Sequence, residues 1–168
     1  MKIRATSKLL KLSGIEPVKD ASILTEKLPG EWYASTVSMN RPGKMSIHFL
    51  HYPTLITILI PGKSLNKVIP FLPGRISSLL DRHGYSKLKY QFQLETKPEI
   101  YATKSRSILA HMNQMKYNIE FHLALAETID FDQIEDIHFD YIFGISSKLK
   151  KLEFLLDQNS NPRFQEGP

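Results

Sequence analysis

The stretch Thr103-Lys-Ser-Arg-Ser-Ile-Leu-Ala-His-Met-Asn113 joins a short predicted strand, 100–103, to a long predicted helix. Apolar residues recur at helical spacing from this point: Ile108, Leu109, Met112, Met115 and Ile119. Ser105 suits the N-cap position, because its hydroxyl oxygen accepts a hydrogen bond from a free backbone N–H of the first helical turn. We therefore expect a strand-to-helix junction here, with a helix that runs to about Leu125.

Two cations lie at the start of this predicted helix, Lys104 and Arg106, although the positive end of the helix dipole disfavours cations there. With the hydroxyls of Ser105 and Ser107 and the free N–H groups of the first turn, they suit a bound anion such as a phosphate or carboxylate. The alternative is that Ser105 is an ordinary cap and that Arg106 pairs with an internal carboxylate.

A second junction of the same kind lies near the N-terminus. Residues 2–5 are expected to form a strand, and Thr6 is expected to cap the short helix that follows. Arg4, Thr6 and Lys8 then surround another strand-to-helix turn. If the two strands are adjacent and parallel, both junctions meet at one sheet edge and form a single anion pocket. The alternative for Arg4 is again a pair with an internal carboxylate.

His111 and Asn113 complete the candidate anion site. Asn113 follows Arg106 by seven residues, so the two share one helix face. An amide on the helix surface, or a buried amide bonded to the backbone, is the alternative for Asn113. Arg106, His111 and Asn113 are also the residues that a nuclease-like site would place around a phosphate.

The middle of the chain predicts a hairpin. Two β-rich segments, 32–39 and 45–51, flank the turn signal Asn40-Arg-Pro-Gly-Lys44. Residues 54–60 are apolar and β-branched, and fit either a buried strand or a short helix. A helix is expected over 64–83, with a break near Pro73-Gly74, because proline cannot continue a helix.

Residues 87–95 alternate between apolar and polar side chains, which predicts a half-exposed strand with Tyr90 on its apolar face. Tyr85, Tyr90 and Tyr101 would offer stacking surfaces to nucleic-acid bases if they were exposed, although Tyr90 fits the core better.

Strands and helices in this mixed order predict an α+β fold, with one mostly antiparallel sheet and helices packed on one face. We expect a single domain over 1–158, with a helix at 148–158, and a polar C-terminal tail over 159–168.

The 168-residue chain has no cysteine, which excludes disulfides, thiolate metal sites and a cysteine nucleophile. Its net charge of +5 is unevenly spread. From 61 to 116 there are ten Lys or Arg residues against three acids, whereas 117–147 holds seven acids and no Lys or Arg. One interpretation is that the two stretches complement each other inside the domain, or that both are solvated. The other is that the basic stretch forms a face that binds a polyanion.

Sequence patterns for other chemistries are missing. There is no glycine-rich phosphate loop, nucleophile elbow or His-Glu-x-x-His pattern, so we expect no cofactor and no metal. His48 and His51, three apart on a predicted strand, would lie on opposite faces. If the ambiguous segment around His138 is a strand, Asp136, His138 and Asp140 share a face, which is a loose candidate for metal binding or acid–base chemistry. Without a signal peptide or long apolar run, we expect a soluble, cytoplasmic protein with no membrane contact.

Two segments resemble a bacterial domain family of unknown function. Family members begin with a motif like Ile-Arg-Cys-Thr-x-Lys-Leu-Leu, which reads Ile3-Arg-Ala-Thr-Ser-Lys-Leu-Leu10 here. They later carry one like Arg-Ser-Val-Leu-Gly-Ser-Met-Asn-Asp, which reads Arg106-Ser-Ile-Leu-Ala-His-Met-Asn-Gln114 here. The departures include Ala5 where the family has Cys, so this member lacks any reactive thiol of that position. The resemblance implies a shared fold and, because the family has no established activity, no function.

Three classes of function fit these patterns. The leading prediction is a non-enzymatic binding module for an anionic partner, either nucleic acid or a phosphate-bearing ligand. Its cations would be Arg4, Lys8, Lys104, Arg106 and those of 61–116. The second class is a small toxin-like nuclease or hydrolase. The third is a protein-interaction module that contacts a protein partner through the apolar 55–60 edge or the acidic segment. The sequence leaves open whether the chain is an enzyme, and its oligomeric state.

Overall fold

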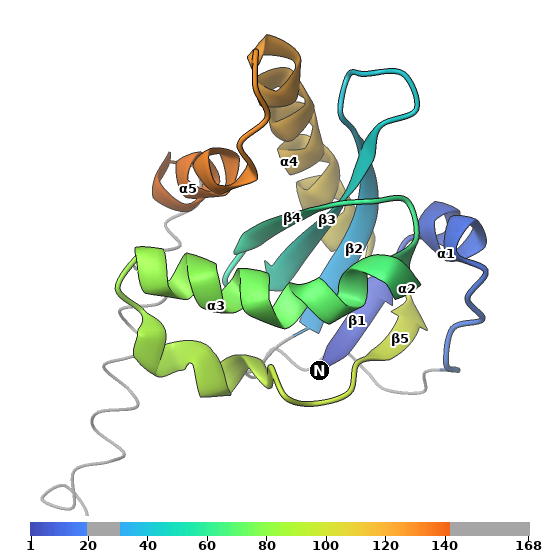
Figure 1. The fold of residues 1–168 in the computed structure, drawn as a ribbon. Helices are drawn as coiled ribbons and strands as arrows, with labels where there is room; N and C mark the ends of the chain where they lie inside the picture. Colours follow the sequence, from blue (N-terminus) through green and yellow to red (C-terminus); the bar gives the residue numbers. More distant parts are fainter. Residues whose placement is uncertain (20–30, 142–168) are drawn as a thin grey trace, which may run out of the picture.

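The computed structural model describes residues 1–19 and 31–141 (Figure 1). Its strands are β1 Lys2–Ala5, β2 Glu31–Ser38, β3 Met45–Tyr52, β4 Thr57–Pro61 and β5 Glu99–Ala102. Its helices, with η for a 3-10 helix, are α1 Ser7–Ser13, α2 Leu65–Val68, η1 Ile69–Phe71, α3 Leu72–Arg82, η2 Ser86–Phe92, α4 Arg106–Leu125 and α5 Phe131–Tyr141. The helix predicted at 148–158 and the tail at 159–168 lie outside the described residues.

The five strands form one mixed sheet in the order β4-β3-β2-β1-β5. β1 is parallel to both of its neighbours, with three residue pairs to β2 and four to β5. β3 is antiparallel to both of its neighbours, with eight residue pairs to β2 and five to β4. Pairing is therefore mostly antiparallel, and the α+β prediction is confirmed. The hairpin predicted around 40–44 is the β2–β3 pair, and the ambiguous segment 54–60 contains all of β4 except its last residue, Pro61.

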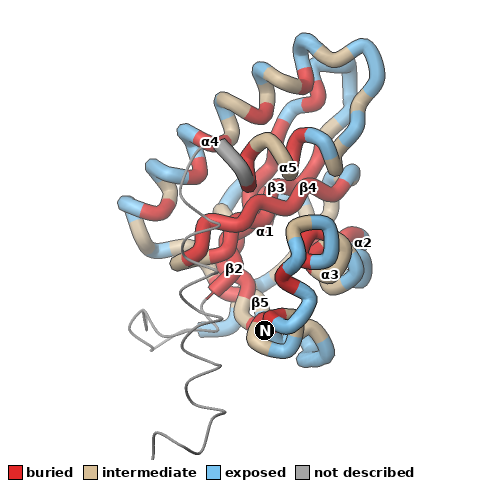
Figure 2. The backbone as a smooth tube through the Cα atoms, turned by 90° about the vertical axis from the view of Figure 1, so that its left-hand side faces the viewer, coloured by how far each residue is buried: buried red, intermediate tan, exposed pale blue. Residues whose placement is uncertain are grey.

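Helices cover both faces of this sheet, so the prediction that they pack on one face is wrong. α2 and α3 lie on one side and α4 on the other, and Figure 2 shows the strands as a nearly continuous buried layer between them. α1 joins the first side, because Leu65 N of α2 donates a 2.9 Å hydrogen bond to Ser13 Oγ of α1. Trp32 and Tyr33 of β2 explain the arrangement: successive strand residues point to opposite faces, and both are buried. A strand that is apolar on both faces needs a layer on each.

The two predicted junctions form as expected. Thr6 caps α1 by accepting a hydrogen bond from Leu9 N at 3.4 Å. Ser105 caps α4 by accepting one from Ile108 N at 3.4 Å. The buried face of α4 repeats the predicted helical spacing, with Ile108, Met112, Met115, Ile119 and Leu123.

The strand predicted at 87–95 is wrong, because 86–92 form the 3-10 helix η2. Its buried side chains, Leu88 and Phe92, are four residues apart, a spacing that fits one side of a helical turn as well as one face of a strand. Tyr90, expected in the core, is 65% exposed. Gln93 ends η2 in the left-handed conformation with φ 51°.

The break in the helix predicted over 64–83 falls earlier than expected. α2 and α3 are separated by η1, the 3-10 turn that contains Pro70. Pro73 instead lies in the first turn of α3, where the backbone N–H that proline lacks would have no helical partner.

α5 covers the outer edge of β4. Glu135 of α5 is buried, and its carboxylate accepts a 2.8 Å hydrogen bond from Leu59 N of β4. Arg75 of α3 approaches the same carboxylate to 2.7 Å, and Arg82 of α3 pairs with Asp136 at 2.9 Å. The acidic stretch thus complements part of the basic one inside the molecule. Among the described residues, no helix is both long and apolar enough to cross a lipid bilayer.

Candidate functional site

The two strand-to-helix junctions lie side by side at one edge of the sheet. β1 and β5 are adjacent and parallel, with Ala5 opposite Ala102. Thr103 N donates a 3.0 Å hydrogen bond to Ala5 O, and Thr6 N donates one of the same length to Ala34 O. The condition set for a shared site, parallel neighbouring strands, is therefore met.

The chain leaves this edge in two opposite directions. β1 continues into α1, on the face that carries α3, and β5 continues into α4, on the other face (Figure 1). In open sheets with parallel strands, ligands bind outside the carboxyl ends of strands whose connections diverge in this way. This edge of β1 and β5 is therefore the candidate functional site.

Arg4 does not point into this site. Its side chain is 3% exposed and donates two hydrogen bonds to Glu31, from Nε at 2.5 Å and from Nη2 at 3.0 Å. Tyr33 OH donates to the same carboxylate at 3.2 Å, and the Arg4 guanidinium lies 5.5 Å from the centre of the Tyr101 ring. Burial, together with the charge of Glu31, raises the pKa of the Tyr33 hydroxyl far above its ordinary value. Arg4 thus follows the alternative stated for it, a pair with an internal carboxylate.

The exposed groups at this edge come from the first residues of the two helices. Lys8 of α1 and Lys104, Arg106 and Ser107 at the start of α4 are exposed. Arg106 forms no ion pair with any of the described residues. Ser105 Oγ lies 3.1 Å from Ser107 Oγ, so the hydroxyl that caps the helix is also hydrogen-bonded to the hydroxyl of Ser107.

Two hydroxyls at this edge were missed by the sequence reasoning. Ser7 is the exposed first residue of α1. Thr103 follows the last residue of β5, and its Oγ1 is shielded from solvent with no hydrogen-bond partner among the described residues. Both residues lie within the quoted segments, and the pairing of β1 with β5 is the information that the sequence lacked.

His111 and Asn113 lie further along α4. Both are exposed, and Asn113 shares the face of Arg106 about 10 Å along the helix axis. His111 lies about 140° around the axis from Arg106. The structure therefore does not bring these three side chains together at the helix start.

The remaining histidine candidates lie in the interior. His48 and His51 of β3 lie on opposite faces of the sheet, as their spacing predicted, and both are buried. His138 lies on the helix α5, so the strand face proposed for Asp136, His138 and Asp140 does not exist. Burial lowers the pKa of His48 to about 3 and that of His138 to about 4. In residues 1–19 and 31–141, no three His, Asp or Glu side chains are arranged to hold a metal ion.

Sheet and helices place the protein in the α+β class, and its sequence identifies the family. The family model for a domain of unknown function, DUF6933, matches residues 2–152. The chain therefore belongs to this family of domains of unknown function. Comparison with curated proteins found no match, and comparison with solved structures found none either.

Proposed function

We propose that the protein is a non-enzymatic binding module for a phosphate-bearing ligand, which binds where β1 and β5 end. The observation that carries this proposal is the meeting of two parallel strand ends whose helices leave to opposite faces. At this point the N-terminus of the 20-residue helix α4 adds its free N–H groups and its dipole.

The side chains at this edge match the chemistry of a phosphate. Arg106 offers a planar pair of donors for phosphate oxygens, and Lys8 and Lys104 add positive charge. The hydroxyls of Ser7 and Ser107 supply neutral donors beside them. Cations at a helix N-terminus are locally unfavourable, and an anion between them would reverse that cost.

A phosphate on a small ligand fits better than the backbone of a long nucleic acid. Several cations of the basic stretch are engaged inside the molecule: Arg75 and Arg82 pair with acids of α5, and Lys89 pairs with Asp81 at 2.6 Å. Of the three tyrosines named for stacking on bases, Tyr85 and Tyr101 are buried, which leaves only Tyr90 on η2 exposed.

The two other classes of function find less support. A nuclease would need His111 and Arg106 at the same phosphate. His111, however, lies about 140° around the axis of α4 from Arg106. An interaction module would need the 55–60 segment exposed, but each of its side chains is buried. Asp132, Glu135 and Asp136 of α5 are likewise paired with arginines of α3.

A titration of three ligands tests the proposal: inorganic phosphate, a nucleoside monophosphate and a single-stranded RNA. We expect Arg106→Ala to weaken phosphate and nucleotide binding about 10-fold, since it removes a charge-assisted contact of roughly 1.5 kcal/mol or more. The matched control is Lys87→Ala, an exposed cation on η2 whose loss should leave binding unchanged.

Calorimetry gives the affinities, and thermal unfolding shows that both variants are folded. If RNA binds more tightly than the small ligands, and the salt dependence of its affinity shows that several phosphates are neutralised, the ligand would be a nucleic acid rather than a small molecule. Equal binding by Arg106→Ala, Lys87→Ala and the unchanged protein would contradict the proposal.

A further inference from the structure

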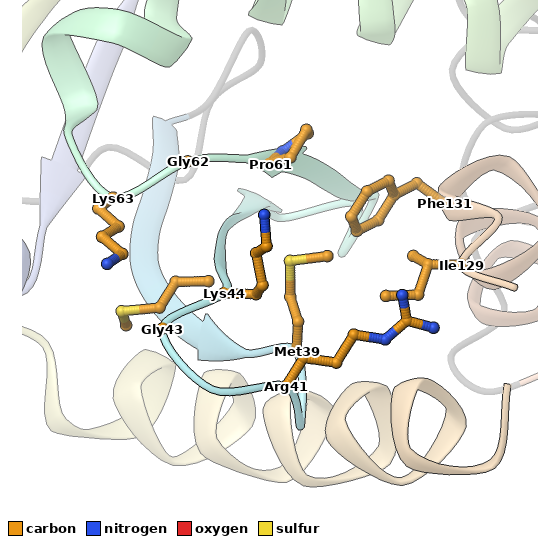
Figure 3. Close-up of a pocket in the computed structure, with 10 residues that line it drawn as sticks. Met39, Arg41, Gly43, Lys44, Pro61, Gly62, Lys63, Ile129 and Phe131 are labelled. Carbon is orange, nitrogen blue, oxygen red and sulfur yellow. The ribbon is translucent and has the colours of Figure 1, made fainter. Parts of the chain in front are cut away.

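A second, separate hollow lies beyond the end of the hairpin. It is a pocket of about 610 Å³ between the β2–β3 turn, the end of β4 and the segment that leads into α5 (Figure 3). β2 runs four residues past Ala34, which pairs with Ala5, so this pocket begins about 13 Å further along the strand than the candidate site. Its volume falls within the usual range for small-molecule sites.

The pocket combines an apolar wall with a ring of cations. Met39, Met45, Ile129 and Phe131 supply the apolar surface. Figure 3 shows the side chains of Arg41, Lys44 and Lys63 around the same pocket. Among the described residues that line it, none is acidic.

The positive charge of this ring is left uncompensated. Arg41 Nη2 donates a 3.0 Å hydrogen bond to the backbone oxygen of Glu127, which holds the guanidinium in place without neutralising it. Within residues 1–19 and 31–141, none of Arg41, Lys44 and Lys63 pairs with a carboxylate. The nearby Asp130 uses one oxygen to cap α5, where it accepts hydrogen bonds of 2.9 and 3.2 Å.

Backbone contacts at Gly62 hold the part of the pocket wall where β4 ends. Gly62 N donates a 2.9 Å hydrogen bond to Met45 O, which ties the end of β4 to the start of β3. Gly62 has φ 149°, and a Cβ there would lie 2.7 Å from Val68 Cγ1, so this position requires glycine. A preformed wall reduces the ordering cost of binding.

We infer that this pocket binds a small aromatic anion, a ring that carries a phosphate or a carboxylate. The ring packs against Phe131 and the two methionines, since thioether sulfur makes favourable contacts with aromatic rings. The anionic group lies on the side of Lys44 and Lys63, and Arg41, whose guanidinium lies beside Ile129, adds positive charge from the other side of the pocket. This site uses none of the residues of the proposed β1–β5 site and stands independently of it.

The test uses phenyl phosphate and benzoate as probes, with inorganic phosphate and benzyl alcohol as the ring-free and charge-free comparisons. We expect phenyl phosphate or benzoate to bind the full chain at least about 10-fold more tightly than either comparison, because only these probes satisfy both halves of the pocket. Whichever of the two binds more tightly identifies the anionic group.

The double variant Lys44→Glu/Lys63→Glu should lower the affinity of the aromatic anion at least about 10-fold, since both lysines are exposed and their reversal repels the ligand. The matched control is Lys87→Glu/Lys97→Glu, which reverses two exposed lysines that belong to neither site and should bind the probe as the unchanged protein does. Unchanged thermal unfolding shows that the double variant is folded. Binding that is absent, insensitive to Lys44→Glu/Lys63→Glu, or no tighter than that of inorganic phosphate would overturn the inference.

Discussion

Arg4 and Glu31 form a buried ion pair that joins two neighbouring parallel strands. Their register places Arg4 opposite Tyr33, and Tyr33 donates a third hydrogen bond to the carboxylate, so both oxygens of Glu31 are satisfied. The cation also lies over the Tyr101 ring of β5, which extends the contact across three strands. This arrangement holds β1 between its neighbours and so positions both helix starts of the candidate site.

A change at Arg4 tests this structural role. Arg4→Met should lower the free energy of unfolding by about 3–5 kcal/mol, because it leaves the charge of Glu31 buried without a partner. Arg4→Met combined with Glu31→Leu should recover much of that loss, since no isolated charge remains. Urea unfolding measures both values. A loss below about 1 kcal/mol for Arg4→Met would instead be typical of an exposed ion pair.

At the scale of elements, the sequence predicted where the two helices begin, but not on which face of the sheet each helix packs. Caps and helical spacing around Thr6 and Ser105 are local signals, and both helices begin where those signals predict. η2 was missed because seven residues with Leu88 and Phe92 inside fit a strand or a helical turn equally well. The position of α4 on the second face depends on contacts between distant segments, which local patterns do not contain.

The candidate sites show the same division. The cations near Ser105 were found because they adjoin a helix cap in the sequence. Arg41, Lys44 and Lys63 come from two separate turns, and the apolar wall adds Phe131 from a third segment. No spacing in the sequence predicts that these residues surround one pocket.

Two buried histidines, His48 of β3 and His138 of α5, predict how stability depends on pH. The pKa of His48 is lowered to about 3 by burial and by the nearby charges of His138 and Lys116. That of His138 is lowered to about 4 by burial and by His122. Unfolded histidines take up protons near pH 6.5, whereas these two stay neutral in the folded protein until the pH is far lower.

The unfolded state therefore binds more protons than the folded state between about pH 6.5 and pH 4, so stability falls as the pH drops through this window. Above pH 6.5 neither histidine contributes to the slope. His138→Leu should make the decline shallower by up to about 1.4 kcal/mol per pH unit. Urea unfolding of both proteins at pH 8, 7, 6 and 5 measures the difference. Parallel curves for the two proteins would show that His138 does not remain neutral in the folded state.

At the scale of the whole molecule, the charge of the chain is partly balanced inside it. Glu135 and Asp136 of α5 pair with Arg75 and Arg82 of α3, and Glu135 also accepts a hydrogen bond from the backbone of β4. A covered edge strand has fewer free N–H groups with which to pair another chain. Exposed cations without a carboxylate partner include Arg106 at the β1–β5 edge and Lys44 and Lys63 at the pocket beside the hairpin.

The most direct test of the central claim, a phosphate site at the ends of β1 and β5, is an NMR titration of the full chain with inorganic phosphate. We expect the backbone N–H signals of Arg106 and Ser107 to shift most and saturably, with smaller shifts at Lys8, because these groups face the anion at the helix start. The hairpin residues around Lys44 should shift less. Saturable shifts that avoid the start of α4, or shifts of equal size at exposed lysines throughout the chain, would contradict the account.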